Sequence, residues 1–501
     1  MLLGVVEALG ALVLLFVVIL YWTTAKLRYW KNRGVPGPTP VPLIGNFGGV
    51  LFRRASIADA MMELYKNWKG PFFGVYNGHS PALVIKDLDL VKNVLIKDFN
   101  VFSGRGVKIN EEIDPLAGHL FNLDGPRWRS LRTKLTPVFT SGKLKHMFNL
   151  MLECADHYEK YLLQEGSKGN VVEFREVAAK FTTDVIGSCA FGISMNALSR
   201  EDSAFRDAGR RLFKSSYWTI LKRMLREAAP KVFETLKVKV IPTDITEFFI
   251  SSVKEAMEFR KRENVIRHDL VDTLMEIEKT HDNKEFEFTE SLMSAQAFVF
   301  FVAGFETSST AISFALQELA HNPEVQDKLI EEILDTVKKC RGELSYEVVN
   351  QMKYLDMVIQ ESLRKDPPGI TLTRSVFERY TLPGTSITLE PRTKVTIPVH
   401  AIHHDEEYYP NPEVFDPERF SEENKRMRHP MAYLPFGDGP KNCIGARFAS
   451  YQVKLGLIKA LKNFRVRPTS LSPFPYEIDK GSFILAPAGG IHLRLEPIEE
   501  K

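Results

Sequence analysis

The pattern of hydrophobic and polar residues predicts a mainly helical chain with small peripheral sheets. Apolar residues recur at the helical period over residues 85–98, 126–137, 143–165, 173–191, 203–225 and 243–278. Alternation typical of strands is confined to short runs. The runs at 72–76 and 81–85 flank Asn77-Gly78, which predicts a hairpin, and further runs occur near residues 376–398 and in the last thirty residues.

A helix that is apolar on all sides is predicted between Thr289 and Asn322. Thr289 suits an N-cap, and Asn322-Pro323 stops the helix. No charge occurs over residues 291–305, and the sequence is apolar all round beyond Gln296. A helix of this kind lies buried through the centre of a domain rather than on its surface.

The N-terminal residues 1–25 predict a transmembrane anchor. Residues 8–25 carry no charge and would span about 27 Å as a helix, close to the roughly 30 Å of a bilayer core. Trp30 suits the membrane interface. A cleaved signal peptide is the competing interpretation, but no basic segment precedes the run and no clear cleavage site ends it. Basic residues after the run favour a cytosolic position for the rest of the chain: Lys26, Arg28, Lys31 and Arg33.

The remaining chain is predicted to form a hinge and one large domain. Residues 26–45 are basic and proline-rich, and residues 36–42 are expected to form a stiff extended spacer. From residue 46 to 501 there is no Ser/Gly-rich linker, low-complexity segment or internal repeat.

Composition and charge exclude several classes of function. The net charge of +3 is too small to imply a nucleic-acid partner, and 44% hydrophobic residues fit a globular chain. Its cysteines are widely spread and include no CxxC pair, which argues against a disulfide scaffold, a zinc site or an iron–sulfur cluster and suits a reducing compartment. They are Cys154, Cys189, Cys340 and Cys443.

The cysteine loop, residues 435–445, is the strongest candidate for chemistry. Its three glycines and two prolines cannot form regular helix or strand, and a helix is predicted directly after it. Cys443 therefore stands at a helix N-terminus, where the dipole and free N–H groups favour a thiolate. A thiolate on a rigid loop suits a flat metallocofactor. For a lone cysteine, a buried structural role is the competing interpretation.

A second candidate lies within the apolar helix, at Ala303-Gly304-Phe305-Glu306-Thr307. A carboxylate at Glu306 would be costly there without a partner or a task. Gly304 removes a side chain where a small ligand could approach, and the Thr307 hydroxyl can bond a carbonyl or an incoming group. An acid–alcohol pair beside a gap suits proton delivery to bound dioxygen, whereas the alternative is a structural cluster with Glu306 reaching solvent.

These stretches, taken together and in order, resemble the cytochrome P450 family. The cysteine loop is similar to the family pattern Phe-x-x-Gly-x-Arg-x-Cys-x-Gly, with Lys441 in place of the arginine. Residues 128–132 resemble its Trp-x-x-x-Arg motif, 303–307 its Gly-x-Glu-Thr motif, and 361–364 its Glu-x-x-Arg motif, while 417–420 read Pro-Glu-Arg-Phe. Finer features resemble insect microsomal members of the family-6 group.

The resemblance implies haem b as the cofactor, with Cys443 as the metal ligand. Glu306 and Thr307 would be the catalytic proton relay with Cys443, and Glu361, Arg364 and Arg419 would form a buried structural triad. Cofactor contacts are implied for Trp128, Arg132, Ala303, Gly304, Arg374, Pro435, Phe436, Gly437, Lys441, Cys443, Ile444 and Gly445. The substrate pocket would be walled by Phe121, Phe301, Ala303, Thr307, Ile370 and Leu485.

The implied activity is a monooxygenase that inserts one oxygen atom of O2 into lipophilic small molecules such as plant toxins or insecticides. Electrons would come from NADPH through NADPH–cytochrome P450 reductase, because the chain has no nucleotide-binding Gly-x-Gly-x-x-Gly fingerprint. Cytochrome b5 stays open as a further donor. The expected location is the endoplasmic reticulum membrane, facing the cytosol. Alternatives are an endogenous hormone, fatty acid or steroid hydroxylase, a reductase-independent haem-thiolate isomerase, and a non-catalytic haem-binding sensor or carrier.

Overall fold

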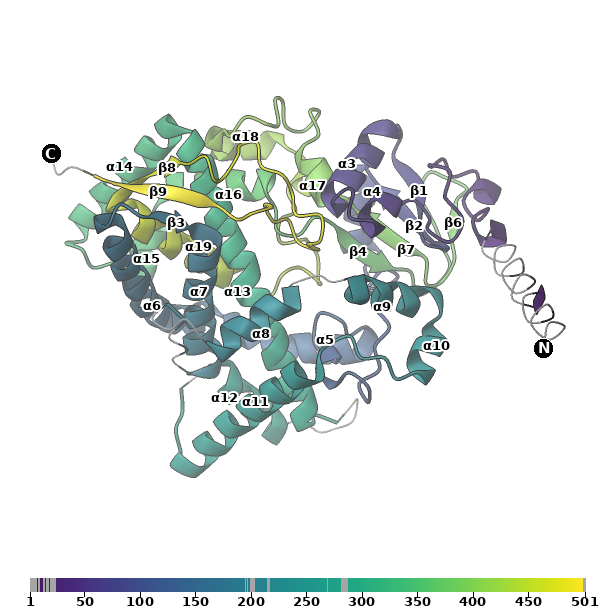
Figure 1. The fold of residues 1–501 in the computed structure, drawn as a ribbon, viewed down its shortest axis with the longest axis horizontal. Coiled ribbons are helices and arrows are strands. Elements are labelled where there is room, and N and C mark those ends of the chain that lie inside the picture. Colours follow the sequence, from purple (N-terminus) through teal and green to yellow (C-terminus); the bar gives the residue numbers. More distant parts are fainter. Residues whose placement is uncertain are drawn as a thin grey trace.

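The computed structural model describes residues 7, 10, 11, 14, 18 and 24–498, except 194, 196, 199–202, 214–216, 268 and 281–286. The predicted membrane anchor, residues 1–25, lies almost wholly outside the described residues. Within them the fold is mainly helical with small sheets, as predicted (Figure 1).

The helices form the body of the molecule, and their bounds agree closely with the hydrophobic periodicity. They are α2 (Gly48–Leu51), α3 (Ile57–Asn67), α4 (Leu88–Lys92), α5 (Gly125–Leu135), α6 (Ser141–Ser167), α7 (Phe174–Ile186), α8 (Ala204–Phe213), α9 (Tyr217–Ala228), α10 (Pro230–Thr235), α11 (Thr243–Glu263), α12 (Leu270–Thr280), α13 (Glu290–His321), α14 (Pro323–Lys339), α15 (Tyr346–Asn350), α16 (Lys353–Lys365), α17 (Val399–His403), α18 (Glu422–Met427) and α19 (Ala446–Leu461).

Two of the predicted stretches each contain two helices. The stretch 203–225 contains α8 and α9, and residues 214–216 between them lie outside the described residues. The stretch 243–278 contains α11 and α12. Asn264 ends α11 with a left-handed backbone (φ 52°), a conformation that stops a helix and that asparagine tolerates. A break of this kind is invisible to an amphipathic pattern that continues on both sides.

Helix α13 is the central element of the body. Its N-cap is Thr289, whose hydroxyl accepts the Leu292 N–H, and it ends at Asn322 before Pro323, as predicted. It packs against α7, α11, α16 and α19. Among the described residues it is the helix long and apolar enough to cross a membrane, but 67% of its apolar window is buried inside the fold. Its apolar character therefore reflects a place in the core.

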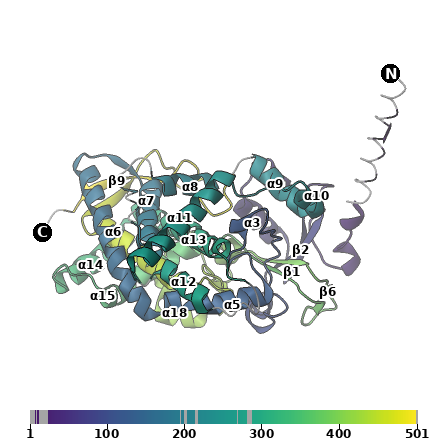
Figure 2. The same cartoon turned by 90° about the horizontal axis from the view of Figure 1, so that it is seen from below.

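Within the described residues, the strands form three small sheets. The largest has the order β1-β2-β7-β4, in which β1 and β2 are the predicted hairpin around Gly78. Its β2–β7 pair is parallel and its other pairs are antiparallel. The strand bounds are β1 (Phe72–Asn77), β2 (Ser80–Ile85), β3 (Val171–Glu173), β4 (Leu372–Ser375), β5 (Tyr380–Thr381), β6 (Thr388–Leu389), β7 (Lys394–Ile397), β8 (Phe464–Pro468) and β9 (His492–Pro497). In Figure 2, α9 and α10 lie on the side of the molecule that carries the β1–β2 hairpin.

Trp30, expected at the membrane interface, is buried in the domain instead. Trp30 is only 3% exposed, and its indole N–H donates to the Val75 carbonyl at 3.1 Å. The Gly74 N–H donates to the Pro36 carbonyl at 2.8 Å. A Cβ at Gly74 would lie 2.4 Å from the Trp30 ring, so glycine is what lets the indole lie flat on β1. Residues 30–37 are therefore docked on the sheet, because burying an indole outweighs leaving the segment extended in solvent.

Candidate active site

A cavity of about 580 Å³ opens between the cysteine loop and α13, and we call it the thiol cavity. Cys443 lines it from one side, and Ala303, Gly304 and Thr307 line it from α13. Trp128 and Arg132 reach it from α5. The stretches that carried the strongest sequence signals are therefore brought together around one space.

The cysteine loop is held by its own backbone. The Cys443 N–H donates to the Phe436 carbonyl at 2.9 Å, and the Asn442 N–H donates to the Gly439 carbonyl at 3.0 Å. Gly439 has a left-handed φ of 72°, and a Cβ there would lie 2.0 Å from the Leu95 carbonyl oxygen. Only glycine fits at this position, so the loop has one conformation in which the thiol faces the cavity.

A chain of buried polar contacts supports the loop from behind. The Leu434 N–H donates to His403 Nε2 at 2.9 Å, and His403 Nδ1 donates to the Arg364 carbonyl at 3.0 Å. Arg364 binds Glu361 through two hydrogen bonds of 2.7 and 2.9 Å, both side chains being fully buried. Arg419 lies 3.5 Å from the same carboxylate. The structure thus brings Glu361, Arg364 and Arg419 into one cluster.

The electrostatics of Cys443 differ from the expectation for a helix N-terminus. Burial raises the pKa of the thiol, while the Gly445 backbone N–H and the guanidinium groups of Arg132 and Arg105 lower it by less. In the protein without its cofactor, burial therefore raises the pKa of the thiol by more than the helix N-terminus and the two guanidinium groups lower it. A bound metal cation reverses this balance, since a coordinating thiol is deprotonated outright.

Cations are in excess at one edge of the cavity. Arg374 is fully buried, donates to the Thr373 carbonyl at 3.1 Å, and has no partner among the described residues for its Nε and Nη2 groups. Arg132 donates to the carbonyl and side chain of Asn442 at 3.1 and 2.8 Å. Burial and the neighbouring Arg374 charge lower the pKa of Arg105 to about 9, and burial lowers that of Arg374 to about 10.

The acid and alcohol of α13 point in different directions. Thr307 lines the cavity, and its hydroxyl donates to the Ala303 carbonyl at 2.7 Å. Glu306 is buried away from the lining and binds Arg175 of α7 at 2.8 Å. Gly304 also has a packing role, because a Cβ there would lie 2.3 Å from the Ile186 Cδ1. The gap expected beside this glycine is thus partly filled by α7.

Three of the predicted wall residues lie elsewhere. Phe121, Ala303 and Thr307 line the thiol cavity, whereas Phe301, Ile370 and Leu485 do not. The Phe301 ring packs against other aromatic rings, with centroids 5.2 Å from Phe249 and 5.0 Å from Phe305. On a helix that is apolar all round, the sequence does not show which face meets the cavity. Of the predicted cofactor contacts, Gly437 and Arg374 also lie behind the lining residues rather than among them.

Comparison with known proteins settles the family. A profile of the family described as Cytochrome P450 matches residues 35–494. The chain belongs to the cytochrome P450 family. The relative “Probable cytochrome P450 6a14” of Drosophila melanogaster is 42% identical over 486 residues, covering 94% of this chain and 95% of the relative. “Cytochrome P450 6A1” of Musca domestica is 39% identical over 490 residues, 96% of each chain. “Cytochrome P450 6k1” of Blattella germanica is 38% identical over 505 residues, 97% of this chain and 96% of the relative.

This P450 is therefore a monooxygenase of the insect family-6 group, and its cofactor is haem. Membership also implies a redox partner. The residues around the thiol cavity fit the cofactor. Among the described residues, Arg105, Arg374 and Lys441 share one neighbouring carboxylate, Asp124, and Arg132 lies near Arg105, so the edge lacks negative charge. The two propionate groups of haem would supply it, and the unpartnered nitrogens of Arg374 provide donors for them.

Lys441 lines the thiol cavity, but its ammonium is already bonded within the protein. It donates to Asp124 at 2.6 Å and to the Leu123 carbonyl at 3.0 Å, so its contact with a propionate stays a prediction. Burial lowers its pKa to about 8, although Asp124 opposes this shift. The short ammonium can be satisfied by one carboxylate and one carbonyl, whereas an arginine fork would need a wider planar partner.

Arg105 is the cavity residue that sequence reasoning missed. Its guanidinium lies 4.0 Å from the Phe121 ring centroid and donates to the Lys441 carbonyl at 3.4 Å. Its backbone N–H donates to Asp124 at 3.1 Å. The available signal was an arginine between two glycines, Gly104 and Gly106, in a segment of no regular period.

Proposed function

We propose that this P450 oxidises lipophilic small molecules, in particular xenobiotics such as plant toxins or insecticides. The observation that carries the proposal is the thiol cavity, where the Cys443 sulfur faces a wall built from apolar residues of α13 and from Phe121. Such a wall binds substrates by burying apolar surface and does not hold them tightly in one orientation. This suits a range of lipophilic compounds. Hydroxylation of an endogenous hormone, fatty acid or steroid is the alternative.

The site residues divide into those that hold the cofactor and those that handle protons. Bound haem supplies the one-electron and dioxygen chemistry. Cys443 would hold its iron, and Arg105, Arg132 and Arg374 with Trp128 would hold its propionates. Arg374 is fully buried, and Arg105 and Arg132 are half-buried and hydrogen-bonded to the cysteine loop, so the cofactor would be bound in one orientation.

Thr307 and Glu306 would deliver protons in two stages. The Thr307 hydroxyl, now bonded to the Ala303 carbonyl, would turn into the cavity and donate a proton there. Glu306 would bring protons from outside, and its bond to Arg175, a residue that is partly exposed, provides a link towards solvent. The carboxylate must leave Arg175 to reach Thr307.

A change at Thr307 tests this relay. We expect Thr307→Ala to raise the hydrogen peroxide released per NADPH consumed, because oxygen is reduced without productive proton delivery. Thr307→Ser keeps the hydroxyl and is the matched control, in which the ratio of product to NADPH should stay near that of the parent. Equal peroxide release from the alanine and serine variants would contradict a role for the hydroxyl.

The electron donor is inferred to be NADPH–cytochrome P450 reductase, with cytochrome b5 as a possible second donor. The basic face of α5 and α6 supports this inference, because it would attract an acidic partner. It comprises Arg129, Lys134, Lys143 and Lys145. We further infer a location at the endoplasmic reticulum membrane, with the domain in the cytosol, from the uncharged residues 8–25 and the basic residues that follow them.

Reconstitution tests the function. The holoenzyme, the reductase and NADPH are combined with a panel of lipophilic toxins, insecticides, steroids and fatty acids, and both the Soret shift on binding and the oxidised product are measured. We expect products from the toxins and insecticides that require both NADPH and the reductase. Efficient turnover confined to one endogenous lipid would favour the alternative, and turnover without NADPH would contradict a reductase-driven reaction.

A further inference from the structure

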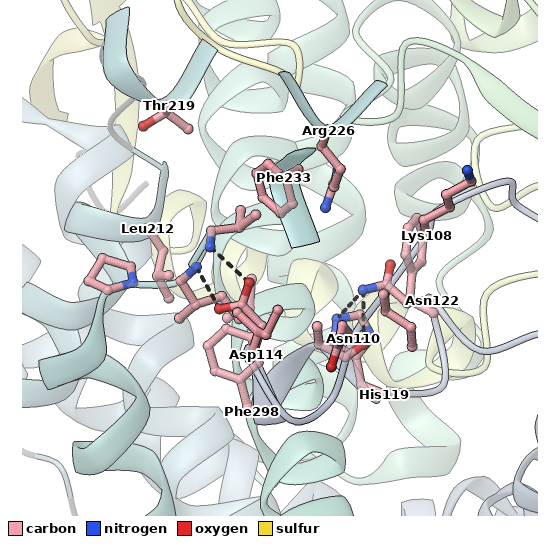
Figure 3. Close-up of a pocket in the computed structure, with 18 of the residues that line it drawn as sticks. Lys108, Asn110, Asp114, His119, Asn122, Leu212, Thr219, Arg226, Phe233 and Phe298 are labelled. Carbon is pink, nitrogen blue, oxygen red and sulfur yellow. Dashed lines mark hydrogen bonds between the residues drawn. The ribbon is translucent and has the colours of Figure 1, made fainter. Parts of the chain in front are cut away.

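A second cavity lies beside the thiol cavity and shares one lining residue with it. This outer chamber, of about 340 Å³, is bounded by the loop 108–122, by α8 to α10, by residues 240–242 and by Phe298 and Val302 of α13 (Figure 3). Phe121 lines both the outer chamber and the thiol cavity, so the two spaces are neighbours across one ring. A compound bound in the outer chamber is thus one side chain away from the cavity wall.

One side chain joins the two walls of the outer chamber. Asp114 of the loop is 6% exposed, and its carboxylate accepts the backbone N–H of Val240 at 2.8 Å and that of Ile241 at 3.3 Å (Figure 3). Within the described part of the chain, no other hydrogen bond joins residues 105–124 to residues 238–242. Bonds from backbone N–H groups to a carboxylate are charge-assisted and stronger than neutral ones.

The loop side of this contact is fixed to the core. Gln296 of α13 accepts the Leu120 N–H at 2.8 Å and donates to the Gly118 carbonyl at 3.1 Å. Glu111 binds Arg127 of α5 through two bonds of 2.7 and 3.1 Å. Asp114 therefore projects from a loop that is anchored on both sides of it.

The opposite side is bonded to the helices that cover the chamber. The Val238 N–H donates to the Phe233 carbonyl of α10 at 3.2 Å, and Lys222 of α9 donates to the Lys239 carbonyl at 2.9 Å. These partners all belong to one covering unit, α9 to residue 242. Asp114 is thus a polar contact between residues 238–242 of that unit and the anchored loop.

We propose that Asp114 is a latch residue that holds this covering unit closed over the outer chamber. When the unit moves outwards, both N–H bonds break together and the freed groups are hydrated. Their strength then sets how often the chamber opens, and hence how fast a lipophilic compound reaches or leaves the thiol cavity. The latch is a positioning residue and touches no reacting atom. The inference rests on the proposed function, because it takes the compound that passes through the outer chamber to be lipophilic.

Asp184 provides a matched control within the same chain. Its carboxylate, 8% exposed, accepts two consecutive backbone N–H groups, those of Ala197 at 2.7 Å and Leu198 at 3.3 Å. Asp114→Asn and Asp184→Asn each replace one acceptor oxygen by an NH2 group that cannot accept. The two variants therefore make the same chemical change, at the outer chamber and away from it.

The test measures ligand exchange in the holoenzyme by stopped-flow absorbance, with 4-phenylimidazole as the probe. We expect Asp114→Asn to raise both the association and the dissociation rate constants about tenfold, which corresponds to about 1.4 kcal/mol. The dissociation constant should change by less than about twofold, because the bound state gains no contact. Unchanged rates in Asp114→Asn, or an equal rise in Asp184→Asn, would overturn the latch.

Hydrogen exchange gives a second readout that does not depend on ligand binding. The amides of Val240 and Ile241 should exchange about tenfold faster in Asp114→Asn, whereas those in the middle of α13 should keep their parent rates. Slow exchange of the Val240 and Ile241 amides in Asp114→Asn would contradict the proposal. Should the parent protein fail to bind haem through Cys443, the proposed function would fall, and this measurement would still decide the latch.

Discussion

Two groups of buried charged residues lie near the cysteine loop, one behind the loop and one at the cavity edge. Their charges are balanced in different ways. Behind the loop, Glu361 faces Arg364 with two short bonds, and Arg364 also donates to the His403 and Pro412 carbonyls. At the cavity edge, Arg374 and its neighbouring cations share the single carboxylate of Asp124, and two nitrogens of Arg374 have no partner among the described residues.

The difference separates a structural charge cluster from a binding site. A buried ion pair whose polar atoms are satisfied within the protein stabilises one conformation and needs nothing further. A buried guanidinium without a partner destabilises the empty protein and becomes favourable only when an anion arrives. The first group therefore stabilises the fold, and the second is complementary to the shape and charge of the cofactor.

The largest effect is expected from the balanced group. Glu361→Ala leaves Arg364 buried and unpaired, so the apparent free energy of unfolding should fall by about 3–5 kcal/mol, measured by denaturant unfolding. Glu390→Ala removes the half-buried partner of the exposed Arg379, 3.2 Å away, and should cost less than about 1 kcal/mol. A loss at Glu361 no larger than at Glu390 would mean that the buried pair is not structural.

A smaller effect of opposite sign is expected at the cavity edge. Arg374→Met removes an unsatisfied buried charge, so the haem-free protein should become more stable by about 1–3 kcal/mol. The same variant should retain less haem after dialysis, because a propionate donor is lost. Arg379→Met, at an exposed arginine, should change neither quantity. If Arg374→Met destabilised the haem-free and haem-bound proteins alike, the guanidinium would be structural.

The smallest effect, taken per pH unit, is the pH dependence of stability at Lys441. Its pKa is lowered from the usual 10.5 to about 8, mainly by burial, with repulsion from Arg105 and Arg374 adding to the shift. Between these two pH values the unfolded chain holds a proton that the folded chain has lost, so stability rises with pH there. The rise is at most about 1.4 kcal/mol per pH unit. Lys441→Met should remove it in the haem-free protein, and an unchanged slope would show that Lys441 titrates normally.

Features set by neighbouring residues could be predicted from the sequence. The ends of α13 follow from a capping threonine and an Asn-Pro pair, and the cysteine loop depends on Gly439, where a Cβ would lie 2.0 Å from a carbonyl oxygen. The predicted grouping of Glu361, Arg364 and Arg419 also agrees with the structure, although that prediction came from family resemblance rather than from spacing.

Features set by distant residues could not be predicted. The direction of Lys441 depends on Asp124, more than three hundred residues earlier in the chain. The role of Phe301 depends on aromatic rings of α8 and α11 that occupy its side of α13. Arg105 lies in an irregular loop, where no period indicates which side chain turns inwards. In each case the deciding partner is brought close only by the tertiary fold.

The most direct test is the absorption spectrum of the reduced, carbon monoxide-bound protein, recorded for the parent and for Cys443→Ala. The parent should show the red-shifted Soret band of a haem whose axial ligand is a thiolate, and the variant should lose it. Cys154→Ala, at a buried cysteine outside the thiol cavity, should keep the band. A parent without the band, or a Cys443→Ala variant that retains it in full, would contradict the assignment of Cys443.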